Sequence, residues 1–126
     1  MMRPIEPSDY NELQSWLDYH KQVDVDLSCL PTTGWIEPGI AAYFYTMTNS
    51  KIMWVDTFIT NPRAELIKRR RVARAFAHMI YQTAKELQIK RLFFLTRNKA
   101  VERVYAKLLN AHNKGEYKLY CTEYEW

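Results

Sequence analysis

The fold is decided by residues 51–94, which read KIMWVDTFITNPRAELIKRRRVARAFAHMIYQTAKELQIKRLFF. Aromatic and β-branched residues dominate Lys51–Thr60, a composition that favours a largely covered strand. Further on, apolar residues recur at helical spacing and predict the longest helix of the chain; they are Val72, Phe76, Met79, Ile80 and Leu87. Arg91–Thr96 is a compact apolar stretch that predicts another strand. The whole stretch therefore predicts a strand, a long helix and a second strand.

Asn61 and Pro62 mark the junction between the first of these strands and the long helix. Asn is favoured as a helix cap, and Pro is favoured at the first helical position because its missing amide hydrogen is not needed there. We therefore expect the helix to begin at Pro62.

The upstream residues predict one short strand and one clear helix. Met2–Ile5 is short and apolar enough to form a first strand. Asp9 and Glu12 have the spacing of a capping box, in which each side chain satisfies a free amide of the first helical turn. Apolar spacing then predicts a helix over Tyr10–His20, and a weaker helical turn covers Val23–Leu27.

The remaining elements complete a mixed sheet. Trp35–Ile36 predicts a short strand, and Ile40–Met47 predicts a strand that forms an antiparallel hairpin with Lys51–Thr60. Asn98–Asn110 is amphipathic and predicts a helix, whereas Tyr117–Tyr124 alternates like a terminal strand. This order predicts an α/β protein, of the mixed α+β kind, with a mostly antiparallel sheet and helices on both faces.

Composition limits the class of protein. The chain has 126 residues, 48% of them hydrophobic, which fits one domain over residues 1–126. Cys29 and Cys121 have neither metal-site nor disulfide-scaffold spacing, so we expect a reduced, cytoplasmic protein. No apolar run approaches the ~18–20 residues that span a bilayer. Glu6 and Asp9 lie too close to Met1 for a signal peptide, and the three histidines are scattered, so we expect no metal site.

The net charge of +4 is mild, but its distribution is uneven. Six basic residues crowd one segment in which Glu65 is the only acid; they are Arg63, Lys68, Arg69, Arg70, Arg71 and Arg74. Such a cluster favours a phosphate-like anion, although a solvated helix face explains it equally simply. A nucleic-acid partner is disfavoured, because the run lacks the interleaved aromatic residues on which bases stack.

Three local matches accompany this order of elements. Phe58–Pro62 is an apolar-x-apolar-x-Pro strand end, Ala84–Leu92 is a helix end that runs into a strand, and Asn98, Tyr105 and Lys107 share the following helix. Together these features resemble the GNAT family of N-acetyltransferases over nearly the whole chain. The resemblance implies a GNAT-like acyl-CoA N-acyltransferase fold and the use of acetyl-CoA as co-substrate.

The family's most diagnostic element is a (Gln/Arg)-x-x-Gly-x-(Gly/Ala) loop at the start of the long helix, where backbone amides bind the CoA pyrophosphate. The matching positions are Lys68, Arg71 and Ala73, so arginine replaces the central glycine, and about three extra residues separate Pro62 from Lys68. The resemblance implies a phosphate site that comprises Lys68, Arg69, Arg70, Arg71, Val72, Ala73 and Arg74. The arginines either compensate for the lost glycine or mark a site that no longer binds the cofactor.

The resemblance also implies direct acetyl transfer from the thioester to a primary amine of a small molecule or protein. Tyr105 is then the candidate acid for the thiolate, and Asp56 the candidate base; the simpler alternatives are a core tyrosine and an ion-paired aspartate. The other implied cofactor contacts are Phe58 and Ile59 along the pantetheine channel, the Thr60 amide at the thioester carbonyl, and Asn98 and Lys107.

Residues of the amine pocket are implied as well, at Asp24, Asp26, Trp35 and Glu37. The second hypothesis is a catalytically silent GNAT-like binding or assembly module, such as a component of a larger particle. The arginine in place of glycine and the single strand expected after the last helix both favour it. A homodimer or an assembly partner could then supply a missing strand.

Overall fold

The computed structural model describes residues 1–20, 31–47, 49, 51–94 and 99–109. Its elements are β1 (Arg3–Pro4), the 3-10 helix η1 (Pro7–Asp9), α1 (Tyr10–Tyr19), β2 (Gly34–Glu37), β3 (Ala41–Met47), β4 (Ile52–Thr60), α2 (Leu66–Glu86), β5 (Arg91–Phe94) and α3 (Lys99–Leu108). The helical turn expected at 23–27 and the strand expected at 117–124 lie outside the described residues. In the described part of the chain, no helix is both long and apolar enough to cross a membrane.

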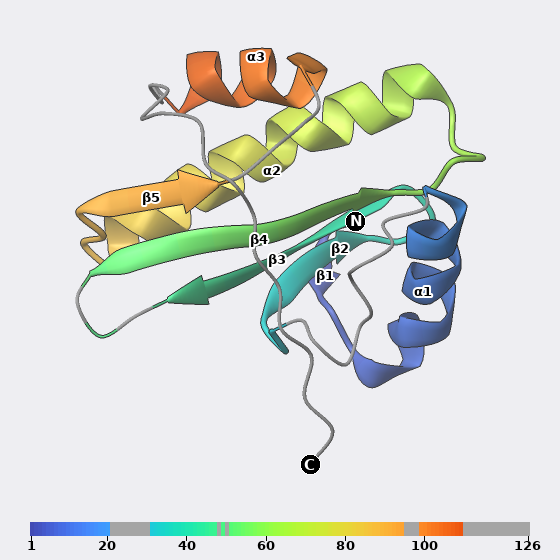
Figure 1. The fold of residues 1–126 in the computed structure, drawn as a ribbon, viewed down its shortest axis with the longest axis horizontal. Coiled ribbons are helices and arrows are strands. Elements are labelled where there is room, and N and C mark those ends of the chain that lie inside the picture. Colours follow the sequence, from blue (N-terminus) through green and yellow to red (C-terminus); the bar gives the residue numbers. More distant parts are fainter. Residues whose placement is uncertain (21–30, 48, 50, 95–98, 110–126) are drawn as a thin grey trace, which may run out of the picture.

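The five strands form one sheet in the order β1-β2-β3-β4-β5. The first three pairings are antiparallel, including the predicted hairpin of β3 and β4, and only β4 and β5 run parallel. Helices α2 and α3 lie on one side of this sheet, and α1 lies at the other (Figure 1). The predicted fold class, a mixed and mostly antiparallel sheet with helices on both faces, is therefore confirmed.

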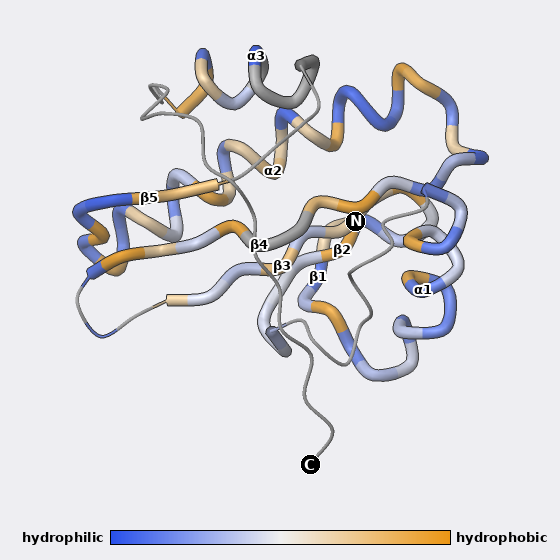
Figure 2. Tube along the Cα trace, viewed as in Figure 1, coloured by the Kyte–Doolittle hydropathy of each residue, from blue (hydrophilic) through white to orange (hydrophobic). Residues whose placement is uncertain are grey.

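Side chains that alternate along the strands belong to two separate hydrophobic cores, one on each face of the sheet. In β3, Tyr43 packs with Phe76 of α2, whereas its neighbour Phe44 packs with Leu13 of α1. This two-sided burial follows from the period of two in a strand, and it explains why β3 reads as a nearly continuous apolar run. Figure 2 shows hydrophobic residues along the strands, and a hydrophilic stretch in α2 that follows the first hydrophobic residues of this helix.

A β-bulge interrupts the pairing of β3 with β4. Phe44 pairs with Thr57 and Tyr45 pairs with Val55, so Asp56 is an extra residue on β4. The bulge shifts the alternation of side chains, and Phe58 joins the α2-side core together with Val55. Trp54 points to the opposite face, where its ring stacks on Phe93 with centroids 4.8 Å apart. Strict alternation along Lys51–Thr60 predicts that Trp54, Asp56 and Phe58 share one face. For Trp54 and Phe58 this prediction is wrong, because the alternation does not continue through a bulge.

Helix α2 begins at Leu66, so the predicted start at Pro62 is also wrong. Asn61 holds the chain in a turn instead of capping the helix. Its Oδ1 accepts from the Arg63 amide at 2.9 Å, and its Nδ2 donates to the Gly39 carbonyl at 2.8 Å. These bonds join the end of β4 to the β2–β3 turn, and they delay the helix by four residues.

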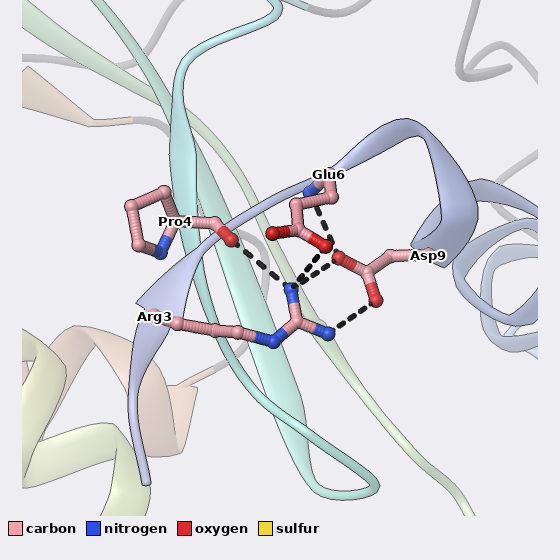
Figure 3. A network of polar contacts seen from close by, with 4 residues as sticks. All are labelled: Arg3, Pro4, Glu6 and Asp9. Carbon is pink, nitrogen blue, oxygen red and sulfur yellow. Dashed lines mark hydrogen bonds and ion pairs between the residues drawn. The ribbon is translucent and has the colours of Figure 1, made fainter.

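The Asp9 carboxylate binds the side chain of Arg3 and does not cap the first turn of α1. The Arg3 guanidinium donates to both carboxylate oxygens, at 2.8 and 2.7 Å, and the Glu6 amide donates to Oδ2 at 2.8 Å (Figure 3). Asp9 makes no side-chain cap bond to α1, so the predicted capping box with Glu12 is wrong. The bidentate ion pair instead fastens β1 to the start of α1.

This ion pair predicts a pH-dependent stability. The hydrogen bond from Arg3 lowers the pKa of the Asp9 carboxyl, and burial opposes the shift only in part. A carboxyl whose pKa is lowered on folding adds stability above its unfolded pKa, and this contribution is lost as the pH falls through the folded pKa. We therefore expect Asp9→Asn to be less stable than wild type at pH 7, with the difference shrinking as the pH falls below about 4.

Urea unfolding midpoints measured between pH 7 and pH 2.5 check this expectation. Glu12→Gln is the matched control, since Glu12 is exposed and makes no cap bond in this structure. Parallel midpoint curves for wild type and Asp9→Asn over this range would contradict the assignment.

Candidate functional site

The C-terminal half of β4 has one edge without a described strand partner. The pairs between β4 and β5 run from Ile52–Arg91 to Val55–Phe94, where the description of β5 ends. The Asn61 amide donates to the Ile40 carbonyl at 2.8 Å, which fixes the phase of the ladder with β3. Because alternate residues of an antiparallel ladder turn their backbone groups outward, the amides of Phe58 and Thr60 face away from β3.

His20 meets this edge from the end of α1. Its Nε2 lies 2.9 Å from the Thr60 carbonyl oxygen and 3.3 Å from Thr60 Oγ1. A carbonyl oxygen can only accept, so Nε2 is the donor. Sequence reasoning missed this contact because the two residues are 40 positions apart. The only local signal was the position of His20 at the end of a predicted helix, which does not specify a partner.

The first turn of α2 follows β4 after a five-residue link, residues 61–65. The first α-helical backbone bond runs from the Arg69 amide to the Glu65 carbonyl at 3.0 Å. The amides of Leu66, Ile67 and Lys68 precede it and have no partner within the helix. Glu65 at the cap position makes no side-chain cap bond. This helix end therefore presents three amides and a partial positive charge.

The basic run lies inside α2 rather than in a loop. Residues 69–74 belong to the helix, so their amides donate to carbonyls four residues earlier. The amides after Lys68 are therefore bonded within the helix, and residues 69–74 could contact a phosphate only through their side chains. The physical reason is that no glycine occurs between 61 and 73, while alanine and arginine favour helix. Arg71, in place of the family's glycine, lies in the second turn.

The side chains of this segment divide between solvent and core. Lys68, Arg70, Arg71 and Arg74 are exposed, and Ala73 is half-buried. Val72 is buried against the sheet, so it contributes to the core rather than to a ligand surface. Arg69 is half-buried, and its Nε has no hydrogen-bond partner among the described residues. The exposed cations thus surround the start of α2, while Arg69 lies closer to the protein interior.

Tyr105 of α3 is a core residue, 2% exposed. Its ring meets Phe94 and Phe58 edge to face, with centroids 5.6 and 6.2 Å apart. Burial raises the pKa of its phenol well above the ordinary value, and the hydroxyl has no hydrogen-bond partner in the described part of the chain. This packing agrees with the simpler alternative, in which Tyr105 is a core tyrosine. A raised pKa also makes the phenol a weaker proton donor. A role as acid stays a prediction.

The other predicted residues are dispersed. Phe58 lies on the α2 side of the sheet, whereas Ile59 is buried under α1, so their side chains do not line one channel. Asp56 forms the bulge, but its side chain lies outside the described part, as do Asn98, Asp24 and Asp26. Lys107 is exposed in the last turn of α3.

Two remaining residues of the predicted amine pocket lie on β2. Trp35 packs half-buried against the α2-side core, and the Glu37 carboxylate forms an ion pair with the Met1 amino group. No group of three or more His, Cys, Asp or Glu side chains in the described ranges could hold a metal ion.

Comparison with known proteins identifies the fold. No family model and no curated protein matches the chain. Among solved structures, a probable acetyltransferase is 11% identical with a TM-score of 0.65, and the match covers 99% of this chain and 98% of that one. A provisionally named acetyltransferase from Agrobacterium tumefaciens strain C58 is 16% identical with a TM-score of 0.66, over 96% and 99% of the two chains.

A third similar structure is an integron cassette protein from the mobile metagenome of Cole Harbour Salt Marsh. It is 15% identical with a TM-score of 0.62, over 96% of this chain and 89% of that one. These identities establish the fold alone. The chain therefore has a GNAT-like acetyltransferase fold, and its activity must be argued from its own residues.

Proposed function

We propose that this protein is an N-acyltransferase that moves an acetyl group from acetyl-CoA to a primary amine of a small molecule or protein. The observation that carries the proposal is the junction between β4 and α2. There, a strand edge without a partner among the described residues is followed, after five residues, by a helix end with three amides that have no partner within the helix and a border of exposed cations. Acetyl-CoA carries its thioester and its pyrophosphate at the two ends of one pantetheine arm, so it needs a group of donors for each.

The phosphates of CoA are assigned to the first turn of α2. Free amides and the positive end of the helix dipole favour a phosphate without further chemistry. Lys68 and Arg70 add charged side chains next to these amides, and arginine can bind a phosphate through two parallel hydrogen bonds. This site begins two residues before the predicted one and shares Lys68 and Arg70 with it. It needs no glycine, because it uses amides that have no partner within the helix.

The thioester carbonyl is assigned to the outward amides of Phe58 and Thr60. An amide at this position donates a stronger hydrogen bond as negative charge develops on the oxygen in the tetrahedral intermediate. The amine, which has lost its ammonium proton to a base, attacks the carbonyl carbon. A C–N bond forms, the C–S bond breaks, and CoA leaves as the thiolate, which takes the second proton of the nitrogen. No covalent enzyme intermediate is required. The predicted roles of Asp56 as base and Tyr105 as acid are not part of this assignment.

Charge reversal at the first turn of α2 tests the phosphate assignment. Lys68→Glu combined with Arg70→Glu should weaken the binding of CoA at least tenfold, since a hydrogen bond to a charged group contributes about 1.5–3 kcal/mol. Isothermal titration and thermal shift with CoA give the measurement; for wild type, ligand at 100 times Kd adds about 2.7 kcal/mol to the stability.

Lys85→Glu combined with Lys90→Glu is the matched control. It makes the same change of net charge with exposed residues at the far end of α2 and beyond it. Equal loss of affinity in both double variants would mean that CoA responds only to overall charge. No binding of CoA to wild type at millimolar concentration would reject the enzyme proposal.

The second candidate function is a catalytically silent binding or assembly module with the same fold. Two observations favour it: α2 continues without a break through residues 69–74, and Tyr105 is a buried core residue. A silent module predicts no stabilisation by acetyl-CoA and no release of free thiol. The titration above therefore separates the two candidates.

A further inference from the structure

The structure brings an imidazole to the backbone edge that the proposed function assigns to the thioester. We infer that His20 accepts the proton of the incoming amine, an inference that rests on the proposed acyltransferase function. The side chain is exposed, and it reaches β4 from α1 at the last residue of the strand. The position of His20 in the sequence does not by itself indicate a catalytic role.

The contact with Thr60 fixes which ring nitrogen is basic. Nε2 donates to the Thr60 carbonyl at 2.9 Å, so the neutral imidazole carries its proton on Nε2 and keeps a lone pair on Nδ1. Within the described residues, Nδ1 makes no hydrogen bond or ion pair, whereas Nε2 is bonded to Thr60. Among the described partners, the ring is therefore held through Nε2 alone, which leaves Nδ1 as the nitrogen that can accept a proton.

The surroundings of His20 leave this nitrogen without a competing charge in the described part of the chain. The Tyr19 ring meets the imidazole edge to face, with centroids 5.5 Å apart. Asp18, the nearest acid on α1, accepts a hydrogen bond from Gln14 Nε2 at 2.9 Å. From β4, the uncharged Thr60 hydrogen-bonds to the ring. Tyr19 thus restricts the ring, and no described carboxylate contacts it.

The direction of the Thr60 backbone connects His20 to the reaction. Both the amide and the carbonyl of Thr60 face away from β3, and His20 occupies the carbonyl. A thioester oxygen bound at the outward amides would lie at the same edge as the imidazole. Tyr105 is less suited to accept a proton, since its phenol is already protonated and its pKa is raised by burial.

The proposed step balances as follows. The ammonium form of the amine gives one proton to Nδ1 of His20, and the neutral nitrogen then attacks the thioester carbon. The C–N bond forms, the C–S bond breaks, and the electron pair leaves with sulfur as the CoA thiolate. The nitrogen loses its second proton to this thiolate, which gives the neutral amide and the free CoA thiol. The proton on the imidazolium passes to water, which restores the neutral ring.

The test uses acetyl-CoA with spermidine as the probe amine and follows thiol release. His20→Gln keeps a side-chain amide that can donate to the Thr60 carbonyl but provides no titratable base. We expect it to bind CoA within twofold of wild type and to lose 10²–10⁴-fold in amine-dependent kcat/KM, the range for general-base catalysis. Free imidazole should restore part of the rate in His20→Ala, a rescue that a merely structural role would not give.

His78→Gln is the matched control, because His78 is exposed on α2 and should leave the rate unchanged. Wild-type rates in His20→Gln would overturn the inference, as would a rate loss in His20→Ala that imidazole does not rescue. A wild type that binds CoA but releases no thiol with spermidine would also overturn it. Failure of wild type to bind CoA is a different result, because it rejects the proposed function itself.

Discussion

Gly34→Ala should leave the protein without a cooperatively folded state at room temperature. Gly34 begins β2 and pairs with Phe44 of β3. A Cβ atom at this position would lie 2.3 Å from the Tyr43 backbone oxygen and 2.8 Å from Ile5 Cδ1. The first clash involves the backbone of the neighbouring strand, which cannot move without breaking the pairing. A cost above about 4 kcal/mol is therefore expected, a large part of the stability of a small domain.

Circular dichroism and thermal melting measure this effect. Gly39→Ala is the control, because an added Cβ meets nothing within 4 Å there and only the backbone angle φ of +78° opposes it. That variant should lose about 1–2 kcal/mol, the cost of a left-handed conformation for a residue with a side chain. If Gly34→Ala melted cooperatively within a few degrees of wild type, the close packing of β2 on β3 would be wrong.

Phe76→Ala should remove about 3–5 kcal/mol, the usual cost of truncating a buried phenylalanine. Phe76 is fully buried in the middle of α2. Its ring meets Tyr43 and Phe58 edge to face, with centroids 4.8 and 5.8 Å apart. The residue thus joins the long helix both to the hairpin and to the strand end that carries the candidate site. Loss of the ring leaves a cavity that the sheet cannot close.

Tyr105→Phe is the matched comparison from the same core. It removes a buried hydroxyl that has no described partner and keeps the ring. The free energy of unfolding should stay within about 1 kcal/mol of wild type or rise, because an unsatisfied polar group no longer has to be desolvated. Guanidinium unfolding of both variants provides the measurement. A loss below 1 kcal/mol for Phe76→Ala would contradict its place at the centre of this core.

Tyr105→Phe also bears on the chemistry. A general acid at this position would make the variant lose rate while its stability holds, whereas a core tyrosine would leave both nearly unchanged. The comparison therefore tests the predicted role of Tyr105 separately from the fold. The expectation from its burial and raised pKa is that the rate persists.

The element order could be predicted because it depends on local periodicity. The apolar spacing in residues 72–87 specifies a helix whatever surrounds it, and the β-branched and aromatic residues of 51–60 specify a strand. The start of α2 could not be predicted in this way. Asn61 has the right chemistry for a cap, but its side chain is used by Arg63 and by Gly39, a residue 22 positions away in the chain.

The bulge at Asp56 could not be predicted from the sequence either. An alternation of side chains can be read along one strand, but a shift of register is a property of two strands. The consequence is that Phe58 joins the core of α2 and Tyr105, while Trp54 lies on the other face. This one extra residue thus decides which side chains at the C-terminal end of β4 lie on the α2 side of the sheet.

The amino-acid sequence by itself determined the composition of the α2–β4 region: a strand, a helix without glycine, and a run of exposed cations at the start of that helix. Only the tertiary structure decided which polar groups this region exposes. It absorbed residues 69–74 into α2, left the amides of Leu66, Ile67 and Lys68 without a partner within the helix, and placed His20 against Thr60. The physical reason is range: helical spacing and charge are local, whereas a free amide or a bonded imidazole depends on residues far apart in the chain.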